Sequence, residues 1–241
     1  MIELENLSKT YDQFSAVQSI NLRIERAEIF GLLGPNGAGK TTTIRMLMGI
    51  LVPTTGTAKI FGMDCHRDRA QIMRRVGYLP DTPVLMDYLR GREILEFIGE
   101  MHGQSKGEAR FKAQSLLKEM DLQEATEEFA VNYSLGMKKK LGLAMALMHD
   151  PDILILDEPI NGLDPRAALH IQQLIRQAAL NGKTIILSTH LLDMAEKLCT
   201  RVGILHQGKL VAAEEISILK QKLAPGGSLE EVFLKLTETS Q

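Results

Sequence analysis

Residues 28–41 read Glu28-Ile29-Phe30-Gly31-Leu32-Leu33-Gly34-Pro35-Asn36-Gly37-Ala38-Gly39-Lys40-Thr41, and they decide the fold. The first six residues form a short apolar run that suits a buried strand, and the others fit the pattern Gly-x4-Gly-Lys-Thr. Apolar residues then recur at helical spacing, at Ile44, Leu47, Met48 and Leu51. We therefore predict a strand, a glycine-rich loop and a helix that starts near Thr42.

This loop has the chemistry of a cradle for a triphosphate. Its glycines let successive backbone N–H groups curl around a polyphosphate, Lys40 supplies a fixed positive charge, and the Thr41 hydroxyl can hold Mg²⁺. The alternative is a glycine-rich turn that binds nothing, and the flanking strand and helix disfavour it. The predicted phosphate contacts are Gly34, Pro35, Asn36, Gly37, Ala38, Gly39, Lys40, Thr41 and Thr42.

Size and composition restrict the class of protein. With 241 residues the chain can bury a core as one domain or as two tightly joined subdomains. Its two cysteines, Cys65 and Cys199, lack metal-ligand spacing, which favours a reducing compartment. The formal charge of −2 argues against a general nucleic-acid binder, and we interpret the Lys138-Lys139-Lys140 run as a solvated face. No apolar run approaches about 18 residues and no leader pattern opens the chain, so we expect a cytoplasmic protein.

The first half of the chain alternates between strand and helix patterns. Ile20, Leu22 and Ile24 alternate with polar residues, and Ile2 and Leu4 begin in the same way, which predicts an antiparallel sheet at the N-terminus. Residues 58–61 and 76–79 are interpreted as short strands of a mixed sheet. Residues 85–131 change to helical spacing, with apolar positions at Ile94, Phe97, Ile98, Met101, Phe111, Leu116, Leu117 and Met120.

The second half predicts an α/β fold. Residues 153–156 and 184–187 are continuous apolar runs, as expected for parallel strands covered on both faces. Residues 202–206 and 209–212 flank Gln207-Gly208 as a hairpin, and Ser228 with Glu231 fits the capping box of a last helix. We predict an ATP-binding core in residues 1–84 and 150–220, a helical subdomain in residues 85–149 and a C-terminal helix in residues 221–241.

Two further segments carry chemistry. Asp157 and Glu158 follow the apolar strand 153–156, at the edge where ligands bind in open α/β sheets. Asp157 can orient a magnesium shell, and Glu158 can polarise a water for attack on a phosphoryl group. Ser134 and Gly136 precede a helical apolar stripe, so Ser134 can cap a helix whose start forms a second anion site. An ordinary helix cap is the alternative for each segment taken alone.

The order of these motifs resembles that of the ATP-binding-cassette (ABC) ATPases, and the likeness covers nearly the whole chain. Besides the phosphate loop and the Asp157-Glu158 pair, the matching motifs are Tyr133-Ser134-Leu135-Gly136-Met137, Asn161-Gly162-Leu163-Asp164 and His190. The resemblance implies an α/β, RecA-like phosphate-loop NTPase core with a mixed or parallel sheet, an N-terminal antiparallel β-subdomain and an inserted α-helical subdomain. It also implies a head-to-tail dimer with ATP between the phosphate loop of one chain and the signature helix of the other.

The resemblance also assigns roles to single residues. It implies that Glu158 is the general base, that His190 contacts the γ-phosphate and the attacking water, and that Asp164 links the two sites. Lys40, Glu158 and His190 are then the catalytic set. Tyr11 stands where the family has an aromatic residue that stacks on adenine. The other implied nucleotide contacts are Val17, Ser134, Gly136 and Asp164, and the implied Mg²⁺ ligands are Thr41, Asp157 and Asp81.

The sequence departs from the family pattern at two places. Asp81 stands where the family usually has Gln or Glu, and a shorter acid must reach Mg²⁺ through water or not at all. The signature motif has Tyr133, Leu135 and Met137 in place of its usual Leu, Gly and Gln, whereas Ser134 and Gly136 are kept.

The motifs look most like those of a bacterial branch that serves multidrug, antibiotic, polysaccharide or ion exporters. We therefore predict an ATP-hydrolysing subunit that works with a second copy of itself or a paralogue and with separate membrane subunits. We expect it at the inner face of the cell membrane, without a nucleic-acid partner. The alternative is a soluble ABC ATPase in a process such as cluster assembly. A GTPase would need an Asn-Lys-x-Asp guanine reader, which the chain lacks, and a kinase would not need the signature helix.

Overall fold

The computed structural model describes residues 1–238, so the last three residues of the predicted helix 221–241 lie outside the described residues. The chain divides into two compact units. Unit 1 comprises Met1–Met73 and Ala178–Gln241, and unit 2 comprises Arg74–Gln177. Within residues 1–238, no helix combines the length and the apolar character that crossing a bilayer requires.

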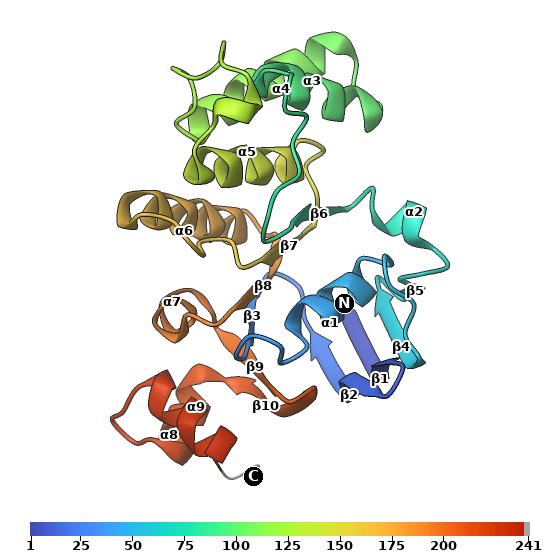
Figure 1. Ribbon diagram of the computed structural model, residues 1–241, viewed down its shortest axis with the longest axis vertical. Coiled ribbons are helices and arrows are strands. Elements are labelled where there is room, and N and C mark those ends of the chain that lie inside the picture. The colour runs from blue at the N-terminus through green and yellow to red at the C-terminus, as the bar shows by residue number, and fades with distance from the viewer. Residues whose placement is uncertain (239–241) are drawn as a thin grey trace. The chain divides into compact units, whose positions relative to one another are not determined.

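An antiparallel sheet forms the N-terminal part of unit 1 (Figure 1), in the order β2-β1-β4-β5. Its strands are β1 (Ile2–Tyr11), β2 (Phe14–Ile24), β4 (Thr55–Ile60) and β5 (Met63–Asp64). The predicted alternation is confirmed, because Ile20, Leu22 and Ile24 are all buried. Residues 58–61 pair with β1 in this sheet, so their prediction as part of a mixed sheet with residues 76–79 was wrong.

The second sheet of unit 1 carries the phosphate loop. Its strands are β3 (Ile29–Leu33), β8 (Thr184–Thr189), β9 (Arg201–His206) and β10 (Lys209–Glu215). Strand β3 lies between β8 and β9 and is parallel to both, whereas β9 and β10 form an antiparallel hairpin. Both turn residues of this hairpin have positive φ, 47° at Gln207 and 79° at Gly208, as a tight hairpin turn requires. The predicted hairpin is confirmed, and this sheet combines parallel and antiparallel pairs, as the predicted fold class requires.

Helices cover parts of both sheets in unit 1. They are α1 (Lys40–Leu47), α2 (Arg69–Ile72), α7 (Leu192–Leu198), α8 (Ile216–Leu223) and α9 (Leu229–Glu238). Helix α1 packs against β2 and β4 and begins at Lys40, two residues before the predicted start. Helix α9 contacts α7, α8 and β10. The Ser228 hydroxyl accepts a hydrogen bond from the Glu231 N–H at 3.3 Å, which confirms the predicted cap.

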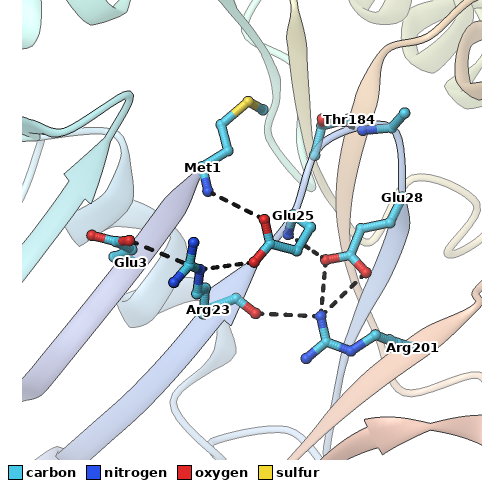
Figure 2. A network of polar contacts seen from close by, with 8 residues as sticks. Met1, Glu3, Arg23, Glu25, Glu28, Thr184 and Arg201 are labelled. Atoms are coloured by element: carbon cyan, nitrogen blue, oxygen red, sulfur yellow. Dashed lines mark hydrogen bonds and ion pairs between the residues drawn. The ribbon is translucent and has the colours of Figure 1, made fainter.

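A polar network fixes the turn between β2 and β3, directly upstream of the phosphate loop (Figure 2). Arg201, at the start of β9, donates from one guanidinium nitrogen to both carboxylate oxygens of Glu28, at 3.0 and 3.2 Å, and to the Arg23 carbonyl oxygen. Glu28 also accepts from the Glu25 N–H at 2.7 Å, and Thr184 at the start of β8 accepts from the Ala27 N–H. These bonds tie the beginning of β3 to both neighbouring strands.

Unit 2 contains two parallel strands and most of the remaining helices. Its elements are β6 (Val76–Leu79), β7 (Ile153–Asp157), α3 (Gly91–Met101), α4 (Lys106–Glu119), η1 (Ala130–Asn132), α5 (Leu135–Leu147) and α6 (Pro165–Leu180) up to Gln177. Helix α5 packs very closely on β6, since a Cβ at Gly77 would lie 2.2 Å from the Ala146 carbonyl oxygen. Glycine is therefore needed where the two elements meet.

The predicted apolar face of the helical segment was wrong in part. Phe97, Met101 and Phe111 are exposed, and the buried face of α3 instead runs through Ile94, Leu95 and Gly99. The reason is the close packing of α4, because a Cβ at Gly99 would lie 2.9 Å from the Ala109 Cβ. Because α4 packs against α3 at Gly99, the buried face of α3 includes this glycine and leaves the larger Phe97 and Met101 exposed.

Candidate nucleotide-binding and hydrolysis site

The phosphate loop connects β3 to α1 in unit 1. Gly37 and Gly39 have φ of 81° and 103°, in the left-handed region that glycine enters without a steric penalty. The Lys40 side chain is buried, and its Nζ donates to the carbonyl oxygens of Gly34 at 2.7 Å and Pro35 at 3.2 Å. The loop therefore has the curled form of a phosphate cradle, with its cation held against the backbone.

The strand register brings His190 to this loop. Leu33 and Thr189 are opposite each other in the parallel pair β3–β8, so the phosphate loop and His190 leave neighbouring strands at the same edge. The Thr189 hydroxyl accepts from the Leu191 N–H at 3.0 Å and fixes the turn that carries His190. A cavity of about 320 Å³ is lined by Gly34, Pro35, Asn36, His190, Leu192 and Phe233.

Phe233 of α9 was not among the predicted site residues. The sequence predicts only that the last helix packs on the domain, because a contact across about 200 residues leaves no local pattern. The cavity places Phe233 on the same wall as the phosphate loop.

Tyr11 and Val17 differ in exposure. Tyr11 is 43% exposed, and Lys9 Nζ lies 5.3 Å from its ring centroid. Val17 is fully buried, and its Cγ2 would lie 3.3 Å from a Cβ at Gly39. The Tyr11 ring is thus accessible to an adenine ring. Val17 instead packs against the phosphate loop at Gly39, from within the protein interior.

In unit 2, the strand register brings Asp81 toward the carboxylate pair. Leu79 is opposite Leu156 in the parallel pair β6–β7, so the segment after β6 and the residues Asp157 and Glu158 emerge at one edge. Asp157 is 2% exposed and Glu158 is 7% exposed. Glu158 has φ of 46°, which is uncommon for a residue with a side chain and marks a constrained position.

Lys139 lies within the same cluster, contrary to its prediction as part of a solvated face. It is 1% exposed, and its Nζ donates to the Glu158 carbonyl oxygen at 2.5 Å and lies 3.4 Å from Asp81 Oδ1. Burial lowers the pKa of the Lys139 ammonium group, and the Asp81 charge opposes that shift. No local sequence signal separates Lys139 from Lys138, because each precedes buried residues of the helix by three and four positions.

The start of α5 has the predicted cap. The Ser134 hydroxyl accepts from the Met137 N–H at 3.3 Å. Tyr133, the first departure in the signature motif, is buried, and its hydroxyl donates to the Ala125 carbonyl oxygen at 2.9 Å. Burial raises the pKa of this phenol, so it stays a neutral donor. Tyr133 therefore anchors the segment that leads into the helix.

An open cavity of about 510 Å³ lies at this helix start in unit 2. Its lining includes three of the predicted nucleotide contacts, Ser134, Gly136 and Asp164. Lys140 and His170 line it as well. Asp164 Oδ1 accepts from the N–H groups of Arg166 at 3.0 Å and Ala167 at 2.9 Å, so this carboxylate also caps α6.

Two of the predicted Mg²⁺ ligands offer oxygen donors, one in each unit. Thr41 offers a hydroxyl in the first turn of α1, and Asp157 offers a buried carboxylate at the end of β7. Hydroxyl and carboxylate oxygens are the ligands that Mg²⁺ takes beside nucleotide phosphates and water. Asp81 is the third predicted ligand, and its carboxylate lies next to Lys139.

The strand, curled loop and helix of unit 1, together with a carboxylate pair at the end of a buried strand, define the class: the chain is a phosphate-loop ATPase. A family profile described as "ABC transporter" matches residues 17–161. The chain belongs to the ABC transporter family, as an ATP-binding subunit that hydrolyses ATP to power transport.

Curated relatives agree with this assignment. The chain is 38% identical over 223 residues to the bacitracin transport ATP-binding protein BcrA of Enterococcus faecalis, covering 92% of this chain and 71% of that protein. It is 41% identical over 212 residues to the Nod factor export ATP-binding protein I of Paraburkholderia xenovorans, covering 88% of this chain and 69% of that protein.

Solved structures agree as well. An ATP-binding subunit of an ABC transporter is 32% identical and matches with a TM-score of 0.90, covering 98% of this chain and 99% of that chain. The dimeric cassette MJ0796 in a post-hydrolysis state, bound to ADP and Pi, is 26% identical and matches with a TM-score of 0.83 over 90% of this chain and 99% of that chain. The predicted fold class is confirmed.

Proposed function

We propose that two cassettes, two copies of this chain or this chain and a paralogue, close head to tail on ATP and that each nucleotide is held by both. The observation that carries this proposal is the open cavity at the start of α5, where Ser134, Gly136 and Asp164 face one space. A helix start with a serine hydroxyl that can still donate its proton, and with a glycine, suits the phosphates of a nucleotide held by a partner's loop. A dimeric relative bound to ADP and Pi supports a nucleotide-binding dimer.

The residues of this chain divide the work of hydrolysis among them. The backbone N–H groups of the phosphate loop and Lys40 neutralise the charge that grows on the transferred phosphoryl group. Glu158 accepts a proton from the attacking water, and His190 holds that water and the γ-phosphate in line. Tyr11 stacks on the adenine and hardly discriminates among bases, because every base has a π-face.

Thr41 and Asp157 hold Mg²⁺ in this proposal, Asp157 by orienting the water shell of the ion. Asp81 forms an ion pair with Lys139 and is left outside the metal shell. A bound Mg²⁺ ion would supply positive charge that stabilises the negative charge developing on the phosphate oxygens. The oxygen chemistry of these side chains supports the assignment.

Transport is proposed to run outward, through separate membrane subunits. The relative named for Nod factor export supports this direction. The chain would then work at the inner face of the cell membrane, where ATP is available. The alternative of a soluble ABC ATPase in cluster assembly lacks comparable support.

Exchange of Glu158 for Gln tests the proposed chemistry. A general base contributes about 10²–10⁴-fold to rate, so we expect Glu158→Gln to lower kcat for ATP hydrolysis at least about 100-fold while ATP still binds. ATP binding is measured by calorimetry and hydrolysis by phosphate release. The matched control is Glu124→Gln, which neutralises an exposed carboxylate of the same unit. Undiminished hydrolysis by Glu158→Gln would remove this residue from the role of base.

A further inference from the structure

We propose that Lys139 is a positioning residue for ATP hydrolysis, which holds the backbone of Glu158 in place, and that Asp81 is its counter-ion. This inference rests on the proposed role of Glu158. It gives a function to the one buried lysine of the Lys138-Lys139-Lys140 run and to the acid that departs from the family pattern.

The Glu158 carbonyl oxygen receives two hydrogen bonds from different directions. The Asn161 N–H donates to it at 3.2 Å within the turn after β7, and Lys139 Nζ donates at 2.5 Å from α5. Glu158 has φ of 46°, a conformation that persists only where surrounding contacts hold it. The Lys139 bond is such a contact, and it fixes the peptide that follows the proposed base. The direction of the Glu158 side chain depends on that peptide.

The charge of Asp81 offsets part of the free-energy cost of burying the Lys139 ammonium group. A charge taken out of water costs several kcal/mol unless it is paired and hydrogen-bonded. Asp81 Oδ1 lies 3.4 Å from Lys139 Nζ, and the Asp81 side chain is 50% exposed, so the pair lies at the border of the protein interior. The pair also joins the segment after β6 to the segment after β7, through a side chain of α5. An amide such as Gln at position 81 could not supply this charge.

Helix α5 connects this pair to the proposed partner-facing site. Ser134 caps the helix, and Lys139 lies five residues further along it. Because a helix rises about 1.5 Å per residue and moves as a rigid element, a shift at its start moves Lys139 by a similar amount. The hydrogen bond from Lys139 to the Glu158 carbonyl oxygen therefore depends on what binds at the start of α5.

Three variants test the hydrogen bond. Lys139→Met keeps the length of the side chain and removes the donor, Lys139→Gln restores a neutral donor, and Lys138→Met is the matched control on the same helix. A misplaced reacting group costs on the order of 10- to 100-fold in rate, so we expect Lys139→Met to lower kcat at least about tenfold with KM for ATP changed less than about twofold. We expect Lys139→Gln to recover most of kcat, and Lys138→Met to match the unmodified protein.

Three results would overturn the positioning role. They are an unchanged kcat in Lys139→Met, a rise in KM as large as the fall in kcat, or no recovery in Lys139→Gln. Thermal unfolding of each variant separates a folding defect from a kinetic one. If Glu158→Gln loses activity but Lys139→Met has normal kinetics, the positioning role of Lys139 is wrong and the role of Glu158 as base stands. If Glu158→Gln turns over ATP normally, both roles are wrong.

Asp81→Asn tests the counter-ion. If Asp81 serves Lys139, adding Asp81→Asn to Lys139→Met costs nothing further, because the pair is already broken. The Mg²⁺ concentration for half-maximal hydrolysis then stays unchanged in Asp81→Asn. Two results together would overturn the counter-ion role and make Asp81 a metal ligand. The Mg²⁺ concentration for half-maximal hydrolysis would rise about tenfold in Asp81→Asn, and the fold-losses of kcat from Asp81→Asn and Lys139→Met would multiply in the double variant.

Discussion

At the scale of single residues, the phosphate loop depends on glycine for two separate reasons. Gly37 and Gly39 both have positive φ, which favours glycine over any residue with a Cβ. They differ in their surroundings, because a Cβ at Gly39 would lie 2.5 Å from the Ala16 carbonyl oxygen, whereas a Cβ at Gly37 meets nothing within 4 Å. Backbone strain acts at both positions, and steric overlap acts at Gly39 alone.

We expect Gly39→Ala to destabilise the protein more than Gly37→Ala. Strain at positive φ costs about 1–2 kcal/mol in either variant, and the overlap with Ala16 adds at least about 1 kcal/mol in Gly39→Ala. Urea unfolding of the nucleotide-free protein, followed by circular dichroism, measures the difference. Equal losses would mean that the loop relaxes away from β2 without cost.

The residues that sequence patterns identify are those with a local signal. The phosphate loop and the Ser134 cap depend on neighbours within a few positions, and the structure has both as predicted. Lys139 was assigned to a solvated face because a lysine in a basic run is usually exposed. Its burial depends on Asp81 and Glu158, which are 58 and 19 residues away, and no local pattern includes such distances.

At the scale of elements, the last two helices of unit 1 depend on one carboxylate. Glu196 of α7 accepts from Lys220 Nζ of α8 at 2.5 Å and from the Leu229 N–H at the start of α9 at 2.9 Å. These two hydrogen bonds, the Lys220 bond foremost, lower the pKa of Glu196 below its ordinary value of 4.5. Helix α9 in turn carries Phe233 to the wall of the phosphate-loop cavity.

The attachment of these helices should weaken in acid. A carboxyl group whose pKa is depressed by folding adds stability that is fully present above its unfolded pKa of 4.5, and this stability is lost as the pH falls through the folded pKa. We therefore expect Glu196→Gln to lower the melting temperature at pH 7 and to have a smaller effect at pH 3.5. Differential scanning calorimetry at both pH values measures this, with Glu230→Gln on the exposed side of α9 as control. An equal effect of Glu196→Gln at both pH values would contradict the assignment.

Elements were predicted well where burial is uniform and poorly where it depends on a partner. The strands at residues 153–156 and 184–187 were correct, because continuous apolar runs are typical of strands covered on both faces. In α3, the spacing of Phe97 and Met101 fits a buried face equally well, yet Gly99 allows α4 to approach and leaves both exposed. Apolar spacing identifies a helix but does not determine which of its faces another helix covers.

At the scale of the whole molecule, the proposed function gives the chain two separate sets of nucleotide-binding groups. Unit 1 provides the phosphate loop, Tyr11 and His190, and unit 2 provides an open cavity at the start of α5. In the proposed dimer each site takes its phosphate loop from one copy and its signature helix from the other. A defect in the loop and a defect in the signature helix should therefore complement each other when they lie on different copies.

Mixing two inactive variants tests this claim most directly. Lys40→Ala removes the loop cation, and Ser134→Arg blocks the helix start, so each variant alone should lack ATPase activity. Random pairing of equal amounts makes half of the dimers mixed, each with one intact site of two, so we expect recovery of up to about a quarter of the unmodified specific activity. Phosphate release that stays at the level of the separate variants, or full activity of Ser134→Arg alone, would contradict a site shared between two copies.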